Sequence, residues 1–429
     1  MTVGILGGGL AGLAVATHLG HDSEILEQDE RPGGHCLTVQ EDGFTFDAGG
    51  PHIMFSRNAD TLALMVSLLG DNVRRGRRAN KIFFKGRYVK YPFENGLSDL
   101  EPLDRFECLY HYLVNDAPPP TNFREWLYHT FGRGLTEKYL LPYNEKIWKA
   151  PAEDVAIDWV EGRVPKPPIE DVIKAAVGVE TEGYTHQLHF FYPRRGGIES
   201  LPKALIPRAA KITTGFTVRH VRHSGRGWTV SDGQREREYE RLVATIPIDV
   251  LARVVDGVPE DVAAAVTGLR YNSLLNVALG VERRAMPPFT AVYIPDPSII
   301  CHRISFPEAF SPDNVPPGRS MVVAEITTNR GTGAAAMDDR AVIDEVVRGL
   351  ESMELLDRRS VCYAKVVRTE YGYVVQDRNY RPNLARAKAW FESQGIVLCG
   401  RVAEFEYINM DTCLERGIAR ARQLAQELA

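Results

Sequence analysis

The sequence predicts an α/β protein in which a discontinuous parallel-sheet domain is interrupted by a helical insertion and by an antiparallel β-sheet domain. Three observations lead to this fold class. The chain opens with a short apolar strand, a glycine-rich turn and an apolar helix. Residues 98–180 carry apolar residues at helical spacing, whereas residues 270–330 contain several β-prone runs. Near the end, "GIVLCGR" is again an apolar strand that ends in glycine, and a helix over 411–428 follows.

The composition excludes several classes of protein. A chain of 429 residues suggests two or three domains, and a formal net charge of −5 gives no basic field for nucleic acid. Six scattered cysteines without a C-x-x-C pair indicate reduced thiols, a cytoplasmic protein and no metal site. No apolar run reaches the roughly 18 residues that a membrane span needs. The basic cluster "RRGRR" at 74–78 is expected to be a solvated loop.

The opening segment predicts a dinucleotide site on a Rossmann-like domain. Gly7, Gly9 and Gly12 follow the first strand in the pattern G-x-G-x-x-G. They permit a tight turn, a close approach of the backbone to pyrophosphate, and close packing of helix on sheet. Glu27 ends the second strand 20 residues after Gly7, where a carboxylate can accept hydrogen bonds from ribose hydroxyls.

The next residues favour FAD over NAD. Arg31 and the pair Gly33-Gly34 give a second loop that can pass close to a phosphate or a flavin ring, and the strand-like "FTFDAGG" follows. This arrangement resembles the glutathione-reductase-like FAD family, which includes amine oxidases, protoporphyrinogen oxidase and UDP-galactopyranose mutase. No second G-x-G-x-x-G is present, so a dedicated NAD(P)H domain is not expected.

The remaining elements set the domain boundaries. "KIFFKGRYVKYPF" at 81–93 predicts a β-hairpin, and Pro-rich "APPPT" and "VPKPP" separate the helical segments that follow. "FTVRHVRH…YERLVATIP" predicts antiparallel strands that return to a buried strand. We therefore assign residues 1–60, 190–250 and 390–429 to the FAD-binding domain, 95–180 to the helical insertion, and 61–94 and 251–389 to the β-sheet substrate domain.

Several motifs resemble the UDP-galactopyranose mutases. "YNEKIW" at 143–148 is similar to their Y-x-x-K-x-W segment, and "GRVAEFEYINMD" is similar to the stretch that lies on the flavin near their C-terminus. The FAD start, "GGPHIMFS", "YPF" and "GGI" occur in the same order, so the resemblance covers nearly the full chain.

The resemblance implies a set of site residues. It makes His52, Arg163 and Arg303 the catalytic residues: His52 lies beside the flavin, and the two arginines clamp a diphosphate. It implies that the substrate lies against five aromatic residues, Tyr143, Trp148, Tyr371, Tyr373 and Tyr380. It places the flavin against further residues of the glycine loops and the C-terminal stretch, Gly50, Arg401, Met410 and Asp411. Packing aromatics, surface ion pairs and a packing histidine are the structural alternatives for these side chains.

Three functions follow from this pattern. The resemblance implies a mutase in which N5 of reduced FAD attacks the anomeric carbon of a nucleotide sugar and thereby interconverts its pyranose and furanose forms. Its partners would be the nucleotide sugar and an external reductant such as NAD(P)H or a flavin reductase system. An FAD-dependent oxidase or dehydrogenase of the amine oxidase or protoporphyrinogen oxidase type has the same fold and is the alternative. A non-catalytic FAD-binding protein is the third hypothesis.

Overall fold

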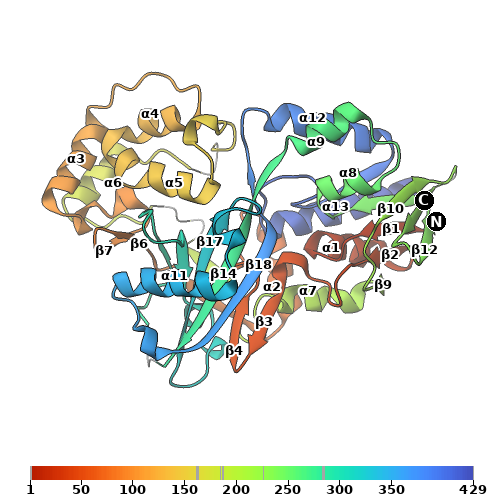
Figure 1. Ribbon diagram of the computed structural model, residues 1–429, viewed down its shortest axis with the longest axis horizontal. Coiled ribbons are helices and arrows are strands. Elements are labelled where there is room, and N and C mark those ends of the chain that lie inside the picture. Colours follow the sequence, from red (N-terminus) through yellow and green to blue (C-terminus); the bar gives the residue numbers. More distant parts are fainter. Residues whose placement is uncertain are drawn as a thin grey trace.

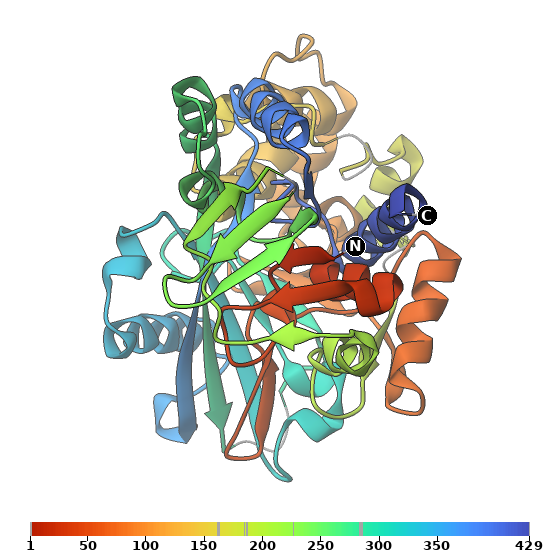
Figure 2. The same ribbon diagram turned by 90° about the vertical axis from the view of Figure 1, so that its right-hand side faces the viewer.

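The computed structural model describes residues 2–160, 164–183, 185, 188–225, 227–282 and 286–428. It confirms the predicted fold class, because a parallel sheet, a large antiparallel sheet and a group of helices are built from segments that alternate along the chain. Figure 1 shows the helical insertion at one end of the molecule, the parallel sheet at the other and the antiparallel sheet between and below them. Both termini lie on the side of the parallel sheet (Figures 1 and 2).

The parallel sheet has the order β19-β13-β1-β2-β9. Its strands are β1 (Val3–Leu6), β2 (Ser23–Leu26), β9 (Ile212–Thr213), β13 (Arg241–Ala244) and β19 (Ile396–Leu398). All neighbouring pairs run parallel. Every residue of β1 and β2 is buried, as expected for strands covered on both faces. On one face, α1 (Leu10–Leu19) packs against α13 (Met410–Leu428).

The other face of the parallel sheet is covered by an antiparallel meander and three helices. The strands are β10 (His220–His223), β11 (Trp228–Ser231) and β12 (Glu236–Tyr239), and the helices are α8 (Ile248–Val254), α9 (Glu260–Thr267) and α12 (Tyr380–Ser393). Leu6 and Leu242 of the sheet share one apolar core with Trp228, Leu251 and Phe391. Figure 2 shows the meander and the parallel strands from the side.

The antiparallel sheet has the order β18-β14-β17-β16-β15-β6-β7. Its strands are β6 (Asn80–Phe84), β7 (Arg87–Lys90), β14 (Arg270–Val281), β15 (Ala291–Tyr293), β16 (Arg303–Ser305), β17 (Ser320–Thr328) and β18 (Val361–Val375). One face packs its apolar residues against α11 (Asp339–Ser352). The predicted hairpin at 81–93 is confirmed: Lys85 (φ 48°) and Gly86 (φ 77°) form the two-residue turn between β6 and β7.

The helical insertion consists of α3 (Pro102–Leu113), α4 (Phe123–Leu135), α5 (Leu141–Trp148) and α6 (Ile169–Ala176). Pro102 occupies the first turn of α3, and the Asn122 side chain caps α4 by accepting a hydrogen bond of 3.0 Å from Glu125 N. A π-helical turn, Thr136–Leu140, joins α4 to α5. Lys149 ends α5 in the left-handed conformation (φ 51°).

The segment that follows the first glycine loops differs from expectation in two ways. Residues 74–78 are not a solvated loop, because β5 (Val73–Arg77) pairs antiparallel with the aromatic strand β8 (His189–Pro193). Gly76 permits this pairing, since a Cβ there would lie 2.3 Å from the Phe190 ring. In addition, α2 (Ala59–Leu69) packs against α7 (Ser200–Leu205) and α13, although residues 61–94 were expected in the substrate domain. Its apolar residues Met65, Leu68 and Leu69 complete the core around α1.

Among the described residues, no helix is long and apolar enough to cross a membrane.

Candidate flavin site

The turn after β1 and the second glycine pair form a backbone cradle at the start of α1. A Cβ on Gly12 would lie 2.2 Å from Gly7 O, so helix and strand approach this closely only with glycine. Gly33 N donates to Gly8 O at 2.9 Å, which holds the second loop beside the first. A Cβ on Gly9 would meet no atom within 4 Å, so the N-terminus of α1 faces open space. This space suits a pyrophosphate held by free N–H groups.

Glu27 lies at one side of the cradle. It is 7% exposed, and its two carboxylate oxygens accept hydrogen bonds from Gly8 N (2.7 Å) and Asp29 N (2.9 Å). Burial raises the pKa of the carboxyl group, while the two backbone donors oppose the shift. The carboxylate thus fixes the glycine loop and stands where an adenosine ribose would meet it.

Arg31 and Glu199 hold the second loop from outside. The guanidinium of Arg31 lies 3.2 Å from the buried carboxylate of Glu199, which also accepts a hydrogen bond of 3.0 Å from Thr38 N. The Arg31 side chain is 60% exposed. Its position indicates that it anchors the loop on α7 and contributes to the cofactor site indirectly.

Two neutral histidines face the inner end of the cradle. The His52 Nδ1 lies 2.6 Å from Gly50 O and therefore donates to it, which leaves Nε2 as an acceptor. Burial, together with the positive charges of Arg401 and Arg303, lowers the pKa of His52 to about 4, although the hydrogen bond to Gly50 opposes the shift. Burial lowers the pKa of His35 to about 3, again with Arg401 nearby. Two guanidinium groups therefore act on the histidine that was predicted beside the flavin.

A row of polar side chains crosses the antiparallel sheet at this point. Asn276, Glu325, Arg303 and Tyr293 occupy directly opposed positions on β14, β17, β16 and β15, so all four point to one face. We call them the polar row. The Asn276 amide donates to Ala48 O at 2.8 Å. A Cβ on Gly50 would lie 2.9 Å from Glu325 Oε2. The polar row therefore lies directly against the loop that carries Gly50.

The central pair of the polar row is buried. Glu325 is 0% exposed, and the Nε and Nη2 groups of Arg303 donate to its two oxygens. The Arg303 side chain keeps 23% exposure, and its other edge, at Nη1, is the edge available to a ligand. In the described part of the chain, the buried Oδ1 of Asn276 and both ring nitrogens of His302 have no hydrogen-bond partner. Buried polar atoms of this kind suit a site that is completed by a bound group.

An aromatic cluster lies beside the polar row. It consists of Trp148 at the end of α5, Tyr373 on β18 and Tyr407 in the segment before α13, with ring centroids 5.6–6.2 Å apart. The Arg401 guanidinium lies 4.6 Å from the Tyr407 ring centroid and 5.8 Å from that of Tyr373. Arg401 also donates to Ile408 O (2.8 Å) and Gly372 O (3.0 Å), and so joins the cradle to the antiparallel sheet. The Arg401 guanidinium thus links the segment before α13 to β18, and Trp148 of α5 packs on the same two tyrosine rings.

Helix α5 is fixed over the polar row by its backbone and by Lys146. The Lys146 ammonium group donates to Ile294 O (2.9 Å) and Asp296 O (2.7 Å), and burial lowers its pKa to about 8. The Asn272 side chain donates to Ile147 O at 2.7 Å. Tyr143 on the same helix contacts the Tyr293 ring edge-on, with centroids 5.6 Å apart. Helix α5 of the insertion therefore places Tyr143 and Trp148 at the end of the polar row that is formed by Tyr293.

Two of the tyrosines predicted for the substrate, Tyr371 and Tyr380, do not join the aromatic cluster. The Tyr371 hydroxyl donates to Asp249 Oδ2 at 3.0 Å, and its ring packs on Tyr271 with centroids 4.5 Å apart. A register shift between Asn272 and Leu274, opposite this part of β18, separates Tyr371 from Tyr373. Tyr380 is 6% exposed, and its hydroxyl donates to Phe405 O at 2.6 Å. Both side chains serve the packing of the parallel-sheet domain.

The remaining predicted residues lie as follows. Met410 begins α13 and is buried, and Asp411 lies in the first turn of that helix. Arg163 lies outside the described residues. The sequence reasoning did not single out Glu325, Tyr293, His35 or Tyr407. Tyr407 lies inside "GRVAEFEYINMD" and Tyr293 lies in the β-prone region 270–330, but only strand register and packing bring these residues to the site.

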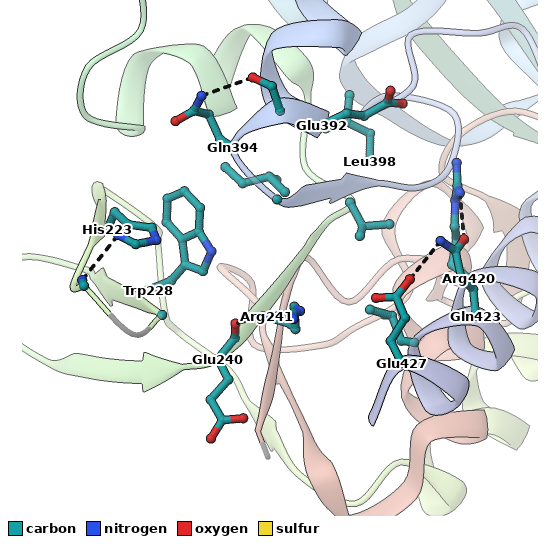
Figure 3. A pocket seen from close by; sticks show the side chains of 17 residues that line it. His223, Trp228, Glu240, Arg241, Glu392, Gln394, Leu398, Arg420, Gln423 and Glu427 are labelled. Carbon is teal, nitrogen blue, oxygen red and sulfur yellow. Dashed lines mark hydrogen bonds between the residues drawn. The ribbon is translucent and has the colours of Figure 1, made fainter. Parts of the chain in front are cut away.

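Among the described residues, no group of histidine, cysteine and acidic side chains could hold a metal ion. A cavity of about 690 Å³ lies elsewhere, between the meander, β19 and the end of α13 (Figure 3). Arg241 and Ile396, the first residues of β13 and β19, line it. It is thus at the amino end of the parallel strands, whereas the glycine cradle is at their carboxyl end, where nucleotides bind in such sheets.

The cradle, the buried carboxylate after β2 and the doubly covered parallel sheet define a dinucleotide-binding protein. The family described as flavin-containing amine oxidoreductases matches residues 10–425. The chain belongs to this family.

Among solved structures, a reduced UDP-galactopyranose mutase is similar over 100% of this chain and 96% of its own, with a TM-score of 0.89 and 25% identity. A protein from Exiguobacterium sp. 255-15 assigned as a protoporphyrinogen oxidase covers 99% of both chains, with a TM-score of 0.77 and 17% identity, and shares the fold. A zeta-carotene-forming phytoene desaturase of Myxococcus xanthus is 44% identical over 48 residues, which are 10% of this chain. The match spans 9% of that desaturase's length.

Proposed function

We propose that the protein binds FAD without a covalent bond and, with the flavin reduced, acts as a nucleotide-sugar mutase of the UDP-galactopyranose mutase type. The observation that carries the proposal is the placement of two arginines on one side of the cradle. Glu325, which lies against Gly50, holds the Arg303 guanidinium, and the Arg401 guanidinium lies on the Tyr407 ring of the aromatic cluster. A diphosphate needs planar cationic donors, and a nucleobase needs flat aromatic faces. Both requirements are met on one side of the cradle.

The chain's own residues would divide the work as follows. Glu325 holds the Arg303 guanidinium side-on, so that its free edge can stabilise the charge of a leaving nucleoside diphosphate. Tyr373 and Tyr407 lie near Arg303 and Arg401 and offer hydroxyl donors to the same oxygens. His52, whose Nδ1 donates to Gly50 O, keeps Nε2 as an acceptor. Reduced FAD in the cradle would supply the nucleophilic N5 for the anomeric carbon of the sugar.

Two features of the site bear on the choice of reaction. No further dinucleotide-binding motif follows the first, so we propose that an external donor, NAD(P)H or a flavin reductase system, reduces the flavin. The alternative is an FAD-dependent oxidase or dehydrogenase, which family membership favours. Substrates such as porphyrinogens or carotenoids need an apolar pocket, and the buried Glu325 and the two guanidinium groups oppose this.

The test is to reduce the purified yellow protein with dithionite and to screen nucleotide sugars for isomerisation by NMR. We expect one nucleotide hexopyranose to give a furanose product with reduced protein only, and no net consumption of reductant. Oxidised protein is the matched control. If no nucleotide sugar reacts or binds, and the oxidised flavin instead is reduced by an amine or a polyene, the mutase proposal fails and the oxidoreductase takes its place.

A further inference from the structure

Arginine side chains are concentrated on the strand pair β5 and β8. These two strands and the residues beside them, 71–78 and 189–195, carry six arginines that are half-buried or exposed. We call them the arginine surface: Arg74, Arg75, Arg77, Arg78, Arg194 and Arg195. The chain as a whole has a formal net charge of −5, so this surface is a local concentration of positive charge on a weakly acidic protein.

Carboxylates neutralise only part of the arginine surface. Arg77 pairs with Glu182 at 2.8 Å, and Arg195 pairs with Asp313 at 2.9 Å. The described residues offer no ion pair to Arg74 and Arg75, which lie in the middle of β5. An excess of positive charge therefore remains beside the solvent.

The backbone holds these arginines in a fixed arrangement. β5 and β8 are in register from Val73 opposite Pro193 to Arg77 opposite His189. Met54 covers the other edge of β8, because it exchanges two backbone hydrogen bonds of 2.8 Å with Phe191. The outer edge of β5 pairs with no strand among the described residues. A partner can therefore reach the arginine surface from this edge.

A short path across the strands joins the arginine surface to the flavin site. Arg75, Phe191 and Met54 lie opposite one another on three adjoining segments. Neighbouring strands are about 4.8 Å apart, so Arg75 and Met54 are about 10 Å apart along the backbone. Met54 lies two residues after His52, the histidine that faces the cradle.

A second path runs through side chains. Arg74 lies opposite Tyr192, whose hydroxyl lies 3.0 Å from both oxygens of the Asp47 carboxylate. Asp47 in turn accepts a hydrogen bond of 3.2 Å from His52 N. Tyr192 and Asp47 are both buried, so this path leads from the strand that carries the arginine surface through the interior to the flavin site.

We infer that the arginine surface docks an acidic one-electron carrier protein, which supplies the electrons for the flavin. The inference rests on the proposed function, because a mutase of this type needs its flavin to be reduced from outside. Guanidinium groups pair with carboxylates in a planar arrangement, and opposite charges steer two proteins together. Contacts between redox partners are small and transient, so a single strand pair is large enough to form one.

Two encounters balance the electron count. Two molecules of the reduced carrier would each lose one electron at the arginine surface. Both electrons, with one proton from the solvent, would pass to the oxidised flavin in the cradle, and the two carriers would leave in their oxidised form. A hydride donor must touch the flavin ring, whereas an electron carrier needs only a short distance to it, which the two paths to His52 provide.

Docking and reduction can be measured separately on the flavin-loaded full chain, with a plant-type ferredoxin, an acidic iron–sulfur carrier, as the probe. Calorimetric titration with oxidised ferredoxin measures docking. Anaerobic stopped-flow absorbance with reduced ferredoxin measures flavin reduction. Arg74→Glu/Arg75→Glu reverses two charges. At about 10 mM ionic strength we expect it to raise the dissociation constant and to lower the second-order rate constant, each at least about 10-fold. At about 1 M the rate constants should converge, because salt screens the charges.

The double variant Arg340→Glu/Arg348→Glu is the matched control. It makes the same change in net charge on α11, which packs on the antiparallel sheet, and should behave as the wild type does. Glutamate also keeps the edge strand β5 charged, so a role limited to preventing strand pairing would leave both measurements unchanged. Dithionite should reduce all three proteins equally fast, which checks that each is folded and loaded.

Three results would overturn the inference. The first is a wild type that ferredoxin neither binds nor reduces. The second is an Arg74→Glu/Arg75→Glu variant that matches the wild type in both measurements. The third is a variant that keeps ferredoxin binding but loses binding to phosphatidylglycerol vesicles, which would make the surface a membrane contact. The screen of nucleotide sugars uses dithionite and no ferredoxin, so a failure of the mutase proposal is seen there and not in these measurements.

Discussion

Arg303 and Glu325 lie directly opposite one another on β16 and β17, and both oxygens of the fully buried carboxylate accept hydrogen bonds from the guanidinium. The pair fixes the plane of Arg303 at a point where its other edge faces the proposed ligand. A buried carboxylate is costly without its cation, so each side chain depends on the other.

The first prediction concerns this pair. Arg303→Lys keeps the positive charge. The lysine ammonium group, however, cannot bind both oxygens of Glu325 and at the same time offer further donors to a ligand. We expect it to weaken binding of UDP to the reduced protein roughly 10- to 100-fold, or about 1.4–2.8 kcal/mol. Titration of tryptophan fluorescence measures this, with Trp148 as the reporter. Arg195→Lys, at an exposed surface ion pair, is the control. Equal affinity in the two variants would remove Arg303 from the diphosphate site.

The second prediction concerns Glu27. Glu27→Gln replaces one acceptor oxygen by a donor, which conflicts with the N–H group of Gly8 or Asp29 and removes a charged partner of the ribose. The loss of about 1.5–3 kcal/mol corresponds to FAD affinity roughly 10- to 150-fold lower. Equilibrium dialysis with the released flavin measured by fluorescence checks it. The exposed neighbour Glu30→Gln should retain FAD as the wild type does, and a wild-type value for Glu27→Gln would refute the assignment.

The third prediction concerns Arg401. Its bonds to Ile408 O and Gly372 O and its contact with Tyr407 require a planar fork, which lysine lacks. Arg401→Lys should therefore loosen the aromatic cluster and lower the thermal stability of the loaded protein, with a loss of roughly 1–3 kcal/mol. Differential scanning calorimetry with and without added FAD is the measurement. We expect FAD to stabilise the variant less than the wild type, and the same increment in both would contradict the link between Arg401 and the cradle.

The fourth prediction is an acid dependence of stability. His52 and His35 are neutral in the fold, with pKa values lowered to about 4 and about 3, and burial holds the pKa of His302 well below its usual value. The unfolded chain binds protons at these histidines below about pH 6.5, whereas the folded chain does not. Stability is therefore complete above pH 6.5 and falls as the pH drops towards 4. Each histidine adds a slope of up to about 1.4 kcal/mol per pH unit.

Urea unfolding of the flavin-loaded protein between pH 7 and pH 4.5 checks this slope. His302→Phe replaces a fully buried imidazole whose nitrogens have no partner among the described residues by an apolar ring. The variant should lose about a third of the slope that the three histidines contribute. A slope equal to that of the wild type would mean that His302 is already protonated in the fold.

The fifth prediction concerns Lys146 of the Y-x-x-K-x-W segment. Lys146→Met keeps the length of the side chain but leaves Ile294 O and Asp296 O without their charged donor. We expect a loss of about 1.5–3 kcal/mol in the free energy of unfolding and a weaker response of Trp148 to nucleotide. Lys138 lies in the π-helical turn after α4 and pairs with Asp104 and Glu107 of α3, so Lys138→Met removes a similar charge away from the polar row. It should lower stability without changing nucleotide binding.

Features that depend on residues close together in the sequence could be predicted. Features that depend on how distant strands pair could not. The cradle was predictable because the glycines, the following helix and Glu27 are close in the sequence and each has one physical role. The resemblance pointed to Arg303 but not to Glu325, because the pair forms across two strands joined by a long connection. A regular strand would place Tyr371 and Tyr373 on one face, and the irregular register beside Asn272 is what separates them. Tyr380 is an aromatic residue whose burial no local pattern reveals.

The order of strands in the parallel sheet has a consequence for biosynthesis. β1 and β2 are made first, but β13 and β19, which complete the sheet, and α13, which covers α1, follow much later in the chain. Until then the apolar surface of the first unit has no cover, and such incomplete units tend to aggregate. The nascent polypeptide must therefore be protected on the ribosome while two inserted units emerge. The cradle that would hold the flavin is therefore complete only after these last segments have joined the sheet.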